Sequence, residues 1–434
     1  MSNDAALDYL NSLGMFGIKL GLDNIRTLLQ RVGNPHRCYP VIHVAGTNGK
    51  GSVCSFLGQI YTSCGYRVGV YTSPHLECFN ERIRIGDELI PTATVAHLTA
   101  ELHSAAADIQ PTFFELTTAM AMLYFARQEV GLVVLETGMG GRLDATNVVN
   151  PVLSIITAIG QDHATYLGHN LADIAAEKGG IIKEGTPVVL APQEPGIEAQ
   201  LQGMARQVNA PCYSYATDYQ VTQVAGDVVT GLRFKIKTPQ RVWPEMRSAL
   251  PGRHQGENLA VALMAVELME RCGMHTVPAD VASAAAQARW PGRLEWLGTP
   301  RSATLPGLVL LDGAHNAAGM TALDHYLEEL GATSIHWVGG FKHDKAADHM
   351  VPLLRRRTQK FYAVAPPVEA AWPPAELVQI ARNYALEAEA FSCIERALIC
   401  AVNSCRGDEI VLVAGSLFLV AQARRIFNAY TWGN

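Results

Sequence analysis

The glycine-rich segment HVAGTNGKGS, at residues 43–52, has residue types that could bind phosphate. Gly46 and Gly49 allow the backbone to curl so that its N–H groups point inward, and Lys50 adds a positive charge. The spacing departs from the standard phosphate-binding pattern, because Gly51 separates Lys50 from the next hydroxyl. The alternative interpretation is a glycine-rich turn with an incidental lysine. An apolar run precedes the segment and a helical pattern follows it, which is the order that a nucleotide site requires, so we predict nucleotide binding here.

Polar side chains that could hold a metal ion follow three other apolar runs. Ser73 follows the first run, Glu136 the second, and His163, next to Asp162, the third. The carboxyl ends of parallel strands meet at one edge of an open α/β sheet, so these groups are expected to converge near the glycine-rich segment. Mg²⁺ prefers oxygen ligands, which makes the imidazole the least expected of them. Each residue also has a structural interpretation: a helix cap for Ser73, a solvated loop for Glu136 and a satisfied pair for the imidazole and its neighbouring aspartate.

The elements that must position these residues form two alternating series of strands and helices. Short, continuous apolar runs are typical of strands buried on both faces, and several of the segments between them have the helical period. We therefore predict an α/β fold with an N-terminal P-loop-type domain, built on a doubly wound and mainly parallel sheet, and a smaller C-terminal Rossmann-like α/β domain. The expected strands of the first domain lie at residues 40–45, 67–71, 132–136, 152–157 and 187–191, and those of the second at 307–312, 334–338, 360–365 and 410–414.

Three further segments interrupt or separate these two series. Residues 217–237 are strand-like and rich in turns, which indicates a small antiparallel excursion, and an apolar helix is expected at about 257–272. The sequence WPGR at residues 290–293 then breaks the periodicity. We place the domain boundary there, so that residues 1–292 bind nucleotide and substrate and residues 293–434 close over them.

Composition restricts the class of protein. The chain has 434 residues and a formal net charge of −6, so an excess of cationic residues for nucleic-acid binding is absent. No run approaches the roughly 20 apolar residues that span a bilayer, and no secretory signal is visible at the N-terminus. The nine cysteines are scattered without a Cys-x-x-Cys pair, which favours a reducing cytoplasm. We expect small-molecule partners, no nucleic acid, no membrane and a monomeric chain.

Taken in order, the motifs of this chain resemble those of the folylpolyglutamate synthase and dihydrofolate synthase family of the Mur ligase superfamily, in its bacterial bifunctional form. Besides the glycine-rich segment, the resemblance rests on motifs that run through nearly the whole chain: YTSPHL at 71–76, FNERIRI at 79–85, TFFELTTA at 112–119, LETGMGGRLDATN at 135–147, QDHATYLG at 161–168, AEKGGII at 176–182, WPGRLE at 290–295, DGAHN at 312–316, HDK at 343–345 and AGSLFLV at 414–420.

The resemblance implies ATP as the nucleotide and assigns residues to it. Asp312 would meet the ribose, and His315 would lie near the phosphates and the incoming amino acid. The positions that match the family's nucleotide contacts are Thr47, Asn48, Gly49, Lys50, Gly51, Ser52, Asn258, Arg293 and Asp312.

The resemblance also implies magnesium, in two ions, and a possible monovalent cation. Ser73, Glu136 and His163 would carry the first magnesium ion. Lys178 matches a lysine that is carbamylated in this family, and its carbamate oxygens would hold the second ion. The implied catalytic set is Lys50, Glu136, His163, Lys178 and His315.

The implied reaction is an ATP-dependent ligation that forms a C–N bond between an acid and an amino acid. L-Glutamate would be added to dihydropteroate, to the γ-carboxylate of reduced folates, or to both. ATP would first convert the acceptor carboxylate to an acyl phosphate, which must be shielded from water, so we expect hinge motion at residues 290–295. The residues that would bind the acceptor or the glutamate are Phe114, Glu115, Leu116, Thr117, Arg142, Leu143, Asp144, Ala145 and Ser416.

Two other classes of protein share part of this pattern. A Mur-type ligase that acts on a nucleotide-linked muropeptide has the same segment and modified lysine, but it carries a whole domain before them, and only 42 residues precede His43 here. A non-catalytic nucleotide-binding regulator would not need a second α/β domain that contributes Asp312 and His315.

Overall fold

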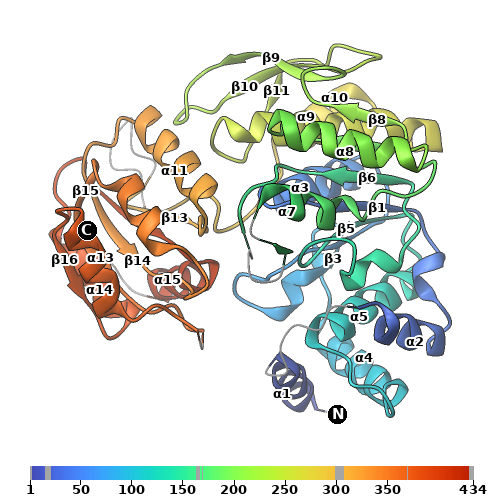
Figure 1. Cartoon of the computed structure of the whole chain (residues 1–434), viewed down its shortest axis with the longest axis horizontal. Helices are drawn as coiled ribbons and strands as arrows, with labels where there is room; N and C mark the ends of the chain where they lie inside the picture. The colour runs from blue at the N-terminus through green and yellow to red at the C-terminus, as the bar shows by residue number, and fades with distance from the viewer. Residues whose placement is uncertain are drawn as a thin grey trace.

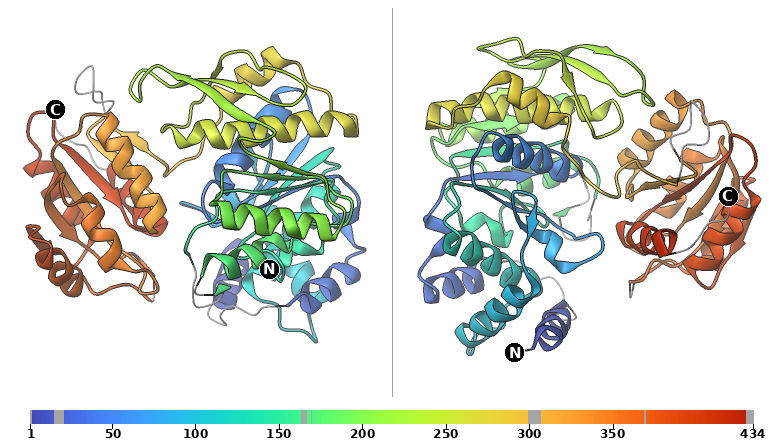
Figure 2. Two further views of the ribbon diagram at one scale, coloured as in Figure 1. Left: turned by 45° about the horizontal axis from the view of Figure 1, so that its top comes forward. Right: turned by 180° about the vertical axis from the view of Figure 1, so that it is seen from behind.

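The computed structural model of the chain describes residues 2–14, 21–162, 167–168, 170–298, 307–368 and 370–429. It consists of two α/β units, a larger N-terminal one and a smaller C-terminal one (Figure 1). Two further views show the same separation, with one connection between them near residue 290 (Figure 2). The α/β class and the two-unit arrangement predicted from the sequence are confirmed.

The N-terminal unit is built on an eight-stranded sheet of order β4-β3-β2-β5-β1-β6-β7-β8. The strands from β2 to β8 in this order pair in parallel, and β3 and β4 are added at one edge in antiparallel fashion. The strands are β1 Val41–Ala45, β2 Val68–Tyr71, β3 Ile83–Ile85, β4 Glu88–Leu89, β5 Leu132–Glu136, β6 Leu153–Ile156, β7 Val188–Leu190 and β8 Cys212–Ser214. The first domain's predicted strands therefore all form, within two residues at each end.

Helices cover both faces of this sheet, as the continuous apolar strands require. On one face, Ile42, Val44 and Val134 pack against α3 (Lys50–Ser63), α9 (His254–Met269) and α10 (Pro278–Ala285). On the other face, Val133 and Leu135 pack against the helices α1 Asn3–Gly14, α2 Asp23–Arg31, α4 Thr92–Ala105 and α5 Phe113–Arg127. The helices α7 (Leu171–Gly179) and α8 (Pro195–Gln207) cover the same face beside β6 and β7. The short 3-10 turns are η1 Pro35–Arg37, η2 Phe79–Arg82, η3 Ala145–Val148, η4 Glu270–Cys272 and η5 Val351–Leu354.

The predicted antiparallel excursion is a separate three-stranded sheet made of β9 (Gln220–Ala225), β10 (Arg233–Lys237) and β11 (Met246–Arg247). Its buried residues Phe234 and Ile236 belong to the same core as α9. In all views this sheet lies over α9 and extends toward the C-terminal unit (Figure 2). The predicted apolar helix is thus the element that joins the small sheet to the large one.

The C-terminal unit has a six-stranded sheet of order β12-β13-β17-β14-β15-β16, in which only β12 is antiparallel to its neighbour. Its strands are β12 Glu295–Leu297, β13 Val309–Asp312, β14 Ile335–Gly339, β15 Thr358–Ala363, β16 Ala388–Ala390 and β17 Ile410–Ala414. The helices that flank it are α11 Ala317–Glu329, α12 Ala347–Met350, α13 Pro374–Asn383, α14 Ile394–Ser404 and α15 Leu417–Ala429.

The connection between the units runs over residues 290–294. Gly292 has φ +75° and Leu294 has φ +48°, so the chain turns sharply there. The Leu294 N–H donates to Asp312 at 2.9 Å, which ties the connection to the end of β13. A Cβ on Gly51 would lie 2.3 Å from the Trp290 ring, so this indole packs directly on the first turn of α3.

Candidate functional site

The glycine-rich segment forms a tight loop between β1 and α3. Gly46 has φ +149° and a Cβ there would lie 1.8 Å from Thr157 Oγ1; Gly49 has φ +91° and a Cβ would lie 2.5 Å from Asn258 Oδ1. Only glycine fits both positions. The N–H groups of Thr47 and Asn48 donate to Ala158 O at 3.0 and 3.1 Å. These two N–H groups therefore hold the loop against the segment after β6, and the N–H groups at the start of α3 are the ones left for an anion.

Lys50 and Glu136 lie together beside this loop. Lys50 Nζ donates to Gly46 O at 3.0 Å and to Thr47 O at 3.3 Å, and it is 3.9 Å from Glu136 Oε1. Glu136 Oε2 accepts the Ser73 N–H at 3.1 Å. Burial raises the pKa of the Glu136 carboxyl group, and the nearby Lys50 charge opposes that rise. The structure thus brings Ser73 and Glu136 together at the carboxyl ends of adjacent strands, whereas His163 lies outside the described residues.

Lys178, on α7, reaches the same loop from the other side. Its side chain is buried, and Nζ donates to Gly46 O at 2.8 Å. Burial, and secondarily the charge of Lys50, lowers the pKa of Lys178 to about 7. A lysine with this pKa is largely neutral in mildly alkaline solution and is therefore nucleophilic.

A cavity of about 340 Å³, the loop cavity, extends from this loop to the C-terminal unit. All the predicted nucleotide contacts line it: Thr47, Asn48, Gly49, Lys50, Gly51, Ser52, Asn258, Arg293 and Asp312. Asp312 accepts hydrogen bonds from Leu294 N at 2.9 Å and Ala314 N at 2.8 Å, and burial raises the pKa of its carboxyl group. The wall of the loop cavity also includes residues that were not predicted from the sequence, among them His254, Gln255, Glu257, Trp290 and Leu294. The position of His254, one helical turn before the predicted nucleotide contact Asn258, could have identified it as a wall residue.

A second cavity of about 450 Å³, the aromatic cavity, adjoins the first. Of the predicted substrate residues, it is lined by Phe114, Glu115, Leu143, Asp144, Ala145 and Ser416. Asp144 is held by Met139 N at 2.9 Å and Thr146 N at 3.0 Å. The missed wall residues include Arg82, Thr112, Phe113, Met139, Lys342 and Lys345. The motifs FNERIRI and HDK contain Arg82 and Lys345, TFFELTTA contains Thr112 and Phe113, and LETGMGGRLDATN contains Met139, so the motifs themselves could have identified these residues.

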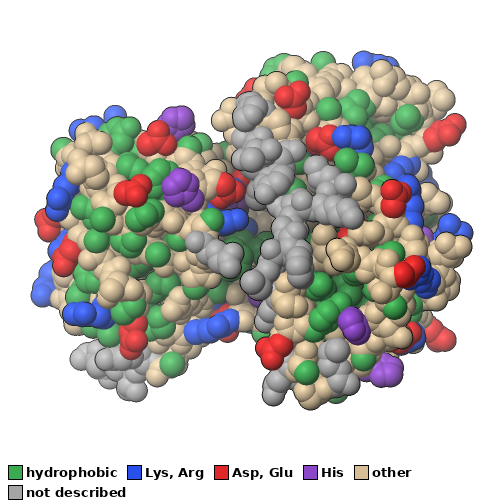
Figure 3. All heavy atoms as spheres, turned by 60° about the horizontal axis from the view of Figure 1, so that its bottom comes forward, with side chains coloured by type: hydrophobic (Ala, Val, Ile, Leu, Met, Phe, Trp, Pro, Cys, Tyr) green, Lys and Arg blue, Asp and Glu red, His purple; other side chains and the backbone are tan. Residues whose placement is uncertain are grey.

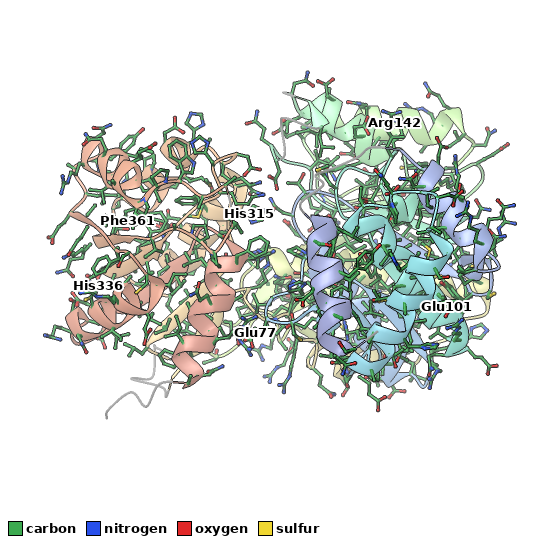
Figure 4. The ribbon with its side chains drawn as sticks, turned by 90° about the horizontal axis from the view of Figure 1, so that it is seen from below. Glu77, Glu101, Arg142, His315, His336 and Phe361 are labelled. Carbon is green, nitrogen blue, oxygen red and sulfur yellow. The ribbon has the colours of Figure 1, made fainter. Side chains whose placement is uncertain are left out.

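Three predicted substrate residues do not reach this cavity. Leu116 and Thr117 are fully buried in α5, and Thr117 Oγ1 lies 3.2 Å from the Tyr71 hydroxyl. They face the core because their positions on α5, directly after the cavity-lining residues Phe114 and Glu115, place their side chains on another face of the helix. Arg142 is exposed and forms an ion pair with Glu177 at 2.7 Å. Figure 4 shows Arg142 at the surface of the larger unit, away from His315.

The two units meet around these cavities, each of which is lined by residues of both units. Figure 3 shows the two lobes side by side. Asn48 and Asn316 exchange hydrogen bonds of 3.1 and 3.4 Å across the junction. Lys345 forms an ion pair with Asp162, and His315 Nε2 lies 3.3 Å from Asp162 Oδ2. His315 projects from the smaller unit toward the larger one (Figure 4).

The residues shared by the two cavities mark where their contents can react. Both cavities are lined by Ser73, Pro74, Gly138, Met139, His315 and Leu417. A phosphate held by the loop and an acid held in the aromatic cavity would meet at this point. The geometry therefore suits phosphoryl transfer to an acid, followed by attack of a nucleophile on the activated acid.

Two family descriptions match the chain: the Mur ligase middle domain over residues 44–266, and the Mur ligase, glutamate ligase domain over residues 292–417. The dihydrofolate synthase/folylpolyglutamate synthase of Bacillus subtilis (strain 168) is 35% identical over 421 residues, covering 94% of this chain and 95% of that protein. The folylpolyglutamate synthase of Lacticaseibacillus casei is 32% identical, covering 92% of this chain and 93% of that protein.

Solved structures are similar over the whole chain. Mycobacterium tuberculosis folylpolyglutamate synthase, complexed with ADP and AMPPCP, has a TM-score of 0.90 and 28% identity, covering 99% of this chain and 100% of that one. Escherichia coli FolC in complex with DHPP and ADP has a TM-score of 0.88 and 27% identity, covering 99% and 98% of the two chains.

Proposed function

The chain belongs to the dihydrofolate synthase/folylpolyglutamate synthase family of ATP-dependent ligases, and from this premise we propose that it adds L-glutamate to dihydropteroate, to the γ-carboxylate of reduced folates, or to both. The acceptor carboxylate is activated as an acyl phosphate, and ADP and phosphate are released. The observation that carries the proposal is the junction of the loop cavity with the aromatic cavity at Ser73, Gly138 and His315. The complexes of relatives with ADP, AMPPCP and DHPP support it.

The residues beside the loop fit magnesium. Glu136 is buried, and of its two oxygens one accepts a single N–H and the other lies 3.9 Å from Lys50, so the carboxylate has coordination capacity left. Ser73 adds a hydroxyl oxygen at the same strand ends, and hard oxygen donors are what Mg²⁺ requires. When bound, the ion supplies charge neutralisation at the transferring phosphoryl group.

Lys178 is proposed to add a further pair of oxygens as a carbamate. Its neutral amine, available because the pKa is about 7, attacks carbon dioxide, forms the N–C bond and releases one proton. The carbamate would stand beside Gly46 O, where Nζ now donates. We propose this role from the burial and low pKa of the side chain, together with the family resemblance.

In the first step, Lys50 and the N-terminus of α3 hold the phosphate groups and neutralise the charge that develops on them. The acceptor carboxylate attacks the γ-phosphorus and the bond to ADP breaks. In the second step, the amine of glutamate attacks the acyl carbon and phosphate leaves. We place this amine near His315 and Ser416, because both line the aromatic cavity from the C-terminal unit.

We propose that residues 1–292 and 293–434 act as two functional domains that close on the substrates and exclude water from the acyl phosphate. The turn at Gly292 and Leu294 is the proposed hinge. All nine cysteines are free, which supports a cytoplasmic location. No helix among the described residues is long and apolar enough to cross a membrane.

The test is phosphate release from ATP in the presence of magnesium and glutamate. Dihydropteroate, tetrahydrofolate and no acceptor are compared. Turnover with both acceptors establishes both activities, and turnover with one acceptor identifies it. Release that is equal with and without acceptor refutes the proposed function.

A further inference from the structure

Arg82 is a buried cation in the wall of the aromatic cavity. It ends η2, immediately before β3, and its side chain is 8% exposed. Nε donates to His75 Nδ1 at 2.8 Å, and Cζ lies 5.2 Å from the centre of the Phe113 ring. Among the residues that the structure describes, the two terminal nitrogens have no hydrogen-bond acceptor, and no carboxylate comes within ion-pair distance. The part of the guanidinium that makes bidentate contacts is therefore unused.

Among the described residues, the neighbours of Arg82 form no ion pair with it, and Glu136 and Glu81 attract its charge only from a greater distance. His75 accepts the hydrogen bond at Nδ1, so this nitrogen carries no proton and adds no negative charge beside the guanidinium. Glu81, the nearest acid in sequence, is committed to the N–H groups of Leu76, Glu77 and Cys78 at 2.7 to 2.9 Å. Arg357, another partly buried arginine, does have an ion-pair partner: its Nε is 2.9 Å from Asp324 Oδ1. A buried cation without a counter-charge is costly, so such a group beside a cavity indicates a site for an anion.

The shape of the anion follows from the donor. A guanidinium presents two parallel N–H groups that match a carboxylate. Arg82 lines the aromatic cavity but not the loop cavity, so it stands away from the phosphate site and from the point where the acyl phosphate forms. It lies between Phe113, at the aromatic end, and His75, two residues beyond Ser73 at the reacting end. The carboxylate it binds is therefore one that does not react.

We propose that Arg82 binds the non-reacting α-carboxylate of the terminal glutamate of a folate acceptor, and so selects acceptors that already carry glutamate. This inference rests on the proposed function. In such an acceptor the α-carboxylate and the reacting γ-carboxylate are separated by Cα and two methylene groups. An anchor at Arg82 thus positions the γ-carboxylate at the junction of the cavities. Dihydropteroate has only the reacting carboxylate and gains nothing from this anchor.

The experiment combines a protein variant with a matching change in the acceptor. kcat/KM is measured for wild type and Arg82→Gln with tetrahydrofolate, with its α-carboxamide, and with dihydropteroate. We expect Arg82→Gln to lower kcat/KM for tetrahydrofolate by about 10- to 100-fold, the value of a charge-assisted pair. The α-carboxamide should lower it by a similar factor in wild type, and the two changes together should add little, because both remove one contact. The loss with dihydropteroate should stay within about threefold.

Arg84→Gln is the matched control. Arg84 is also a largely buried arginine that forms no ion pair with any described residue, although Asp87 attracts its charge; unlike Arg82, its Nη1 donates to Gly86 O at 3.0 Å and the side chain does not line the aromatic cavity. Its loss should affect all three acceptors equally. Equal losses for Arg82→Gln with all acceptors, or full wild-type activity with the α-carboxamide, would overturn the inference while leaving the proposed function intact. Wild-type enzyme that turns over no acceptor would overturn the proposed function and this inference with it.

Discussion

Replacing Glu136 with glutamine tests whether its carboxylate serves catalysis rather than the stability of the fold. The attraction between Lys50 Nζ and Glu136 Oε1 at 3.9 Å is about 4 kcal/mol at an effective dielectric constant of about 20. Keeping Glu136 ionised at 3% exposure costs a comparable amount, so the variant should lose only about 1 kcal/mol of unfolding free energy. The amide cannot hold magnesium as a carboxylate does, so kcat for ADP release should fall by about 100-fold or more.

Glu267→Gln is the matched comparison. Glu267 is a fully buried carboxylate near the C-terminal end of α9. It accepts hydrogen bonds from Thr238 Oγ1 and, at 3.0 Å, from Gln240 N. Glutamine can satisfy only part of this arrangement, so about 2–4 kcal/mol of stability should be lost. Its kcat should stay within twofold of wild type. The urea midpoint and the rate of ADP release at saturating magnesium are measured for both variants. If Glu136→Gln keeps more than a tenth of kcat, or is destabilised as much as Glu267→Gln, the reasoning is refuted.

Three further outcomes are expected. Lys50→Ala should abolish most turnover, measured as ADP release, while the far-UV circular dichroism stays unchanged, because the polar contacts of Lys50 with described residues are confined to the loop and Glu136. Near-normal activity would contradict its role. The folded-state pKa of Lys178 is about 7 and its ordinary value is 10.5, so the unfolded chain binds more protons between these values, and stability in bicarbonate-free buffer should rise with pH across this window. The urea midpoint of the wild type should rise with pH across this window, and that of Lys178→Met should not. The same rise in both proteins would refute the assignment of this pH dependence to Lys178. An ATP analogue with folate should reduce the radius of gyration in solution scattering, since Gly292 and Leu294 allow the units to close; a profile identical to that of the unliganded protein would refute closure.

Local sequence patterns were sufficient to predict most strands of the larger sheet and the chemistry of the loop. Continuous apolar runs and the helical period are local properties, so the strands β1, β2, β5, β6 and β7 and the helix α9 were predicted close to their observed bounds, whereas β3 and β4 were not predicted. The positive φ angles of Gly46 and Gly49 are a local requirement of the tight turn, whereas the close approach of Thr157 and Asn258 to these glycines depends on tertiary packing. The rule that ligands gather at the carboxyl ends of strands then placed Ser73 and Glu136 together.

The direction in which an individual side chain points depends on tertiary packing. Lys178 is 132 residues from Gly46 in sequence, and their contact depends on how α7 packs beside β6. Arg142 belongs to the same motif as Asp144, yet it turns outward to Glu177 while Asp144 turns to the cavity. Leu116 and Thr117 follow Glu115 on one helix but face the core. The lack of an ion-pair partner for Arg82 among the described residues could be recognised only once its neighbours were known. Periodicity encodes the face of an element, but the environment of a given side chain is set by segments distant in sequence, and their packing is not a local property.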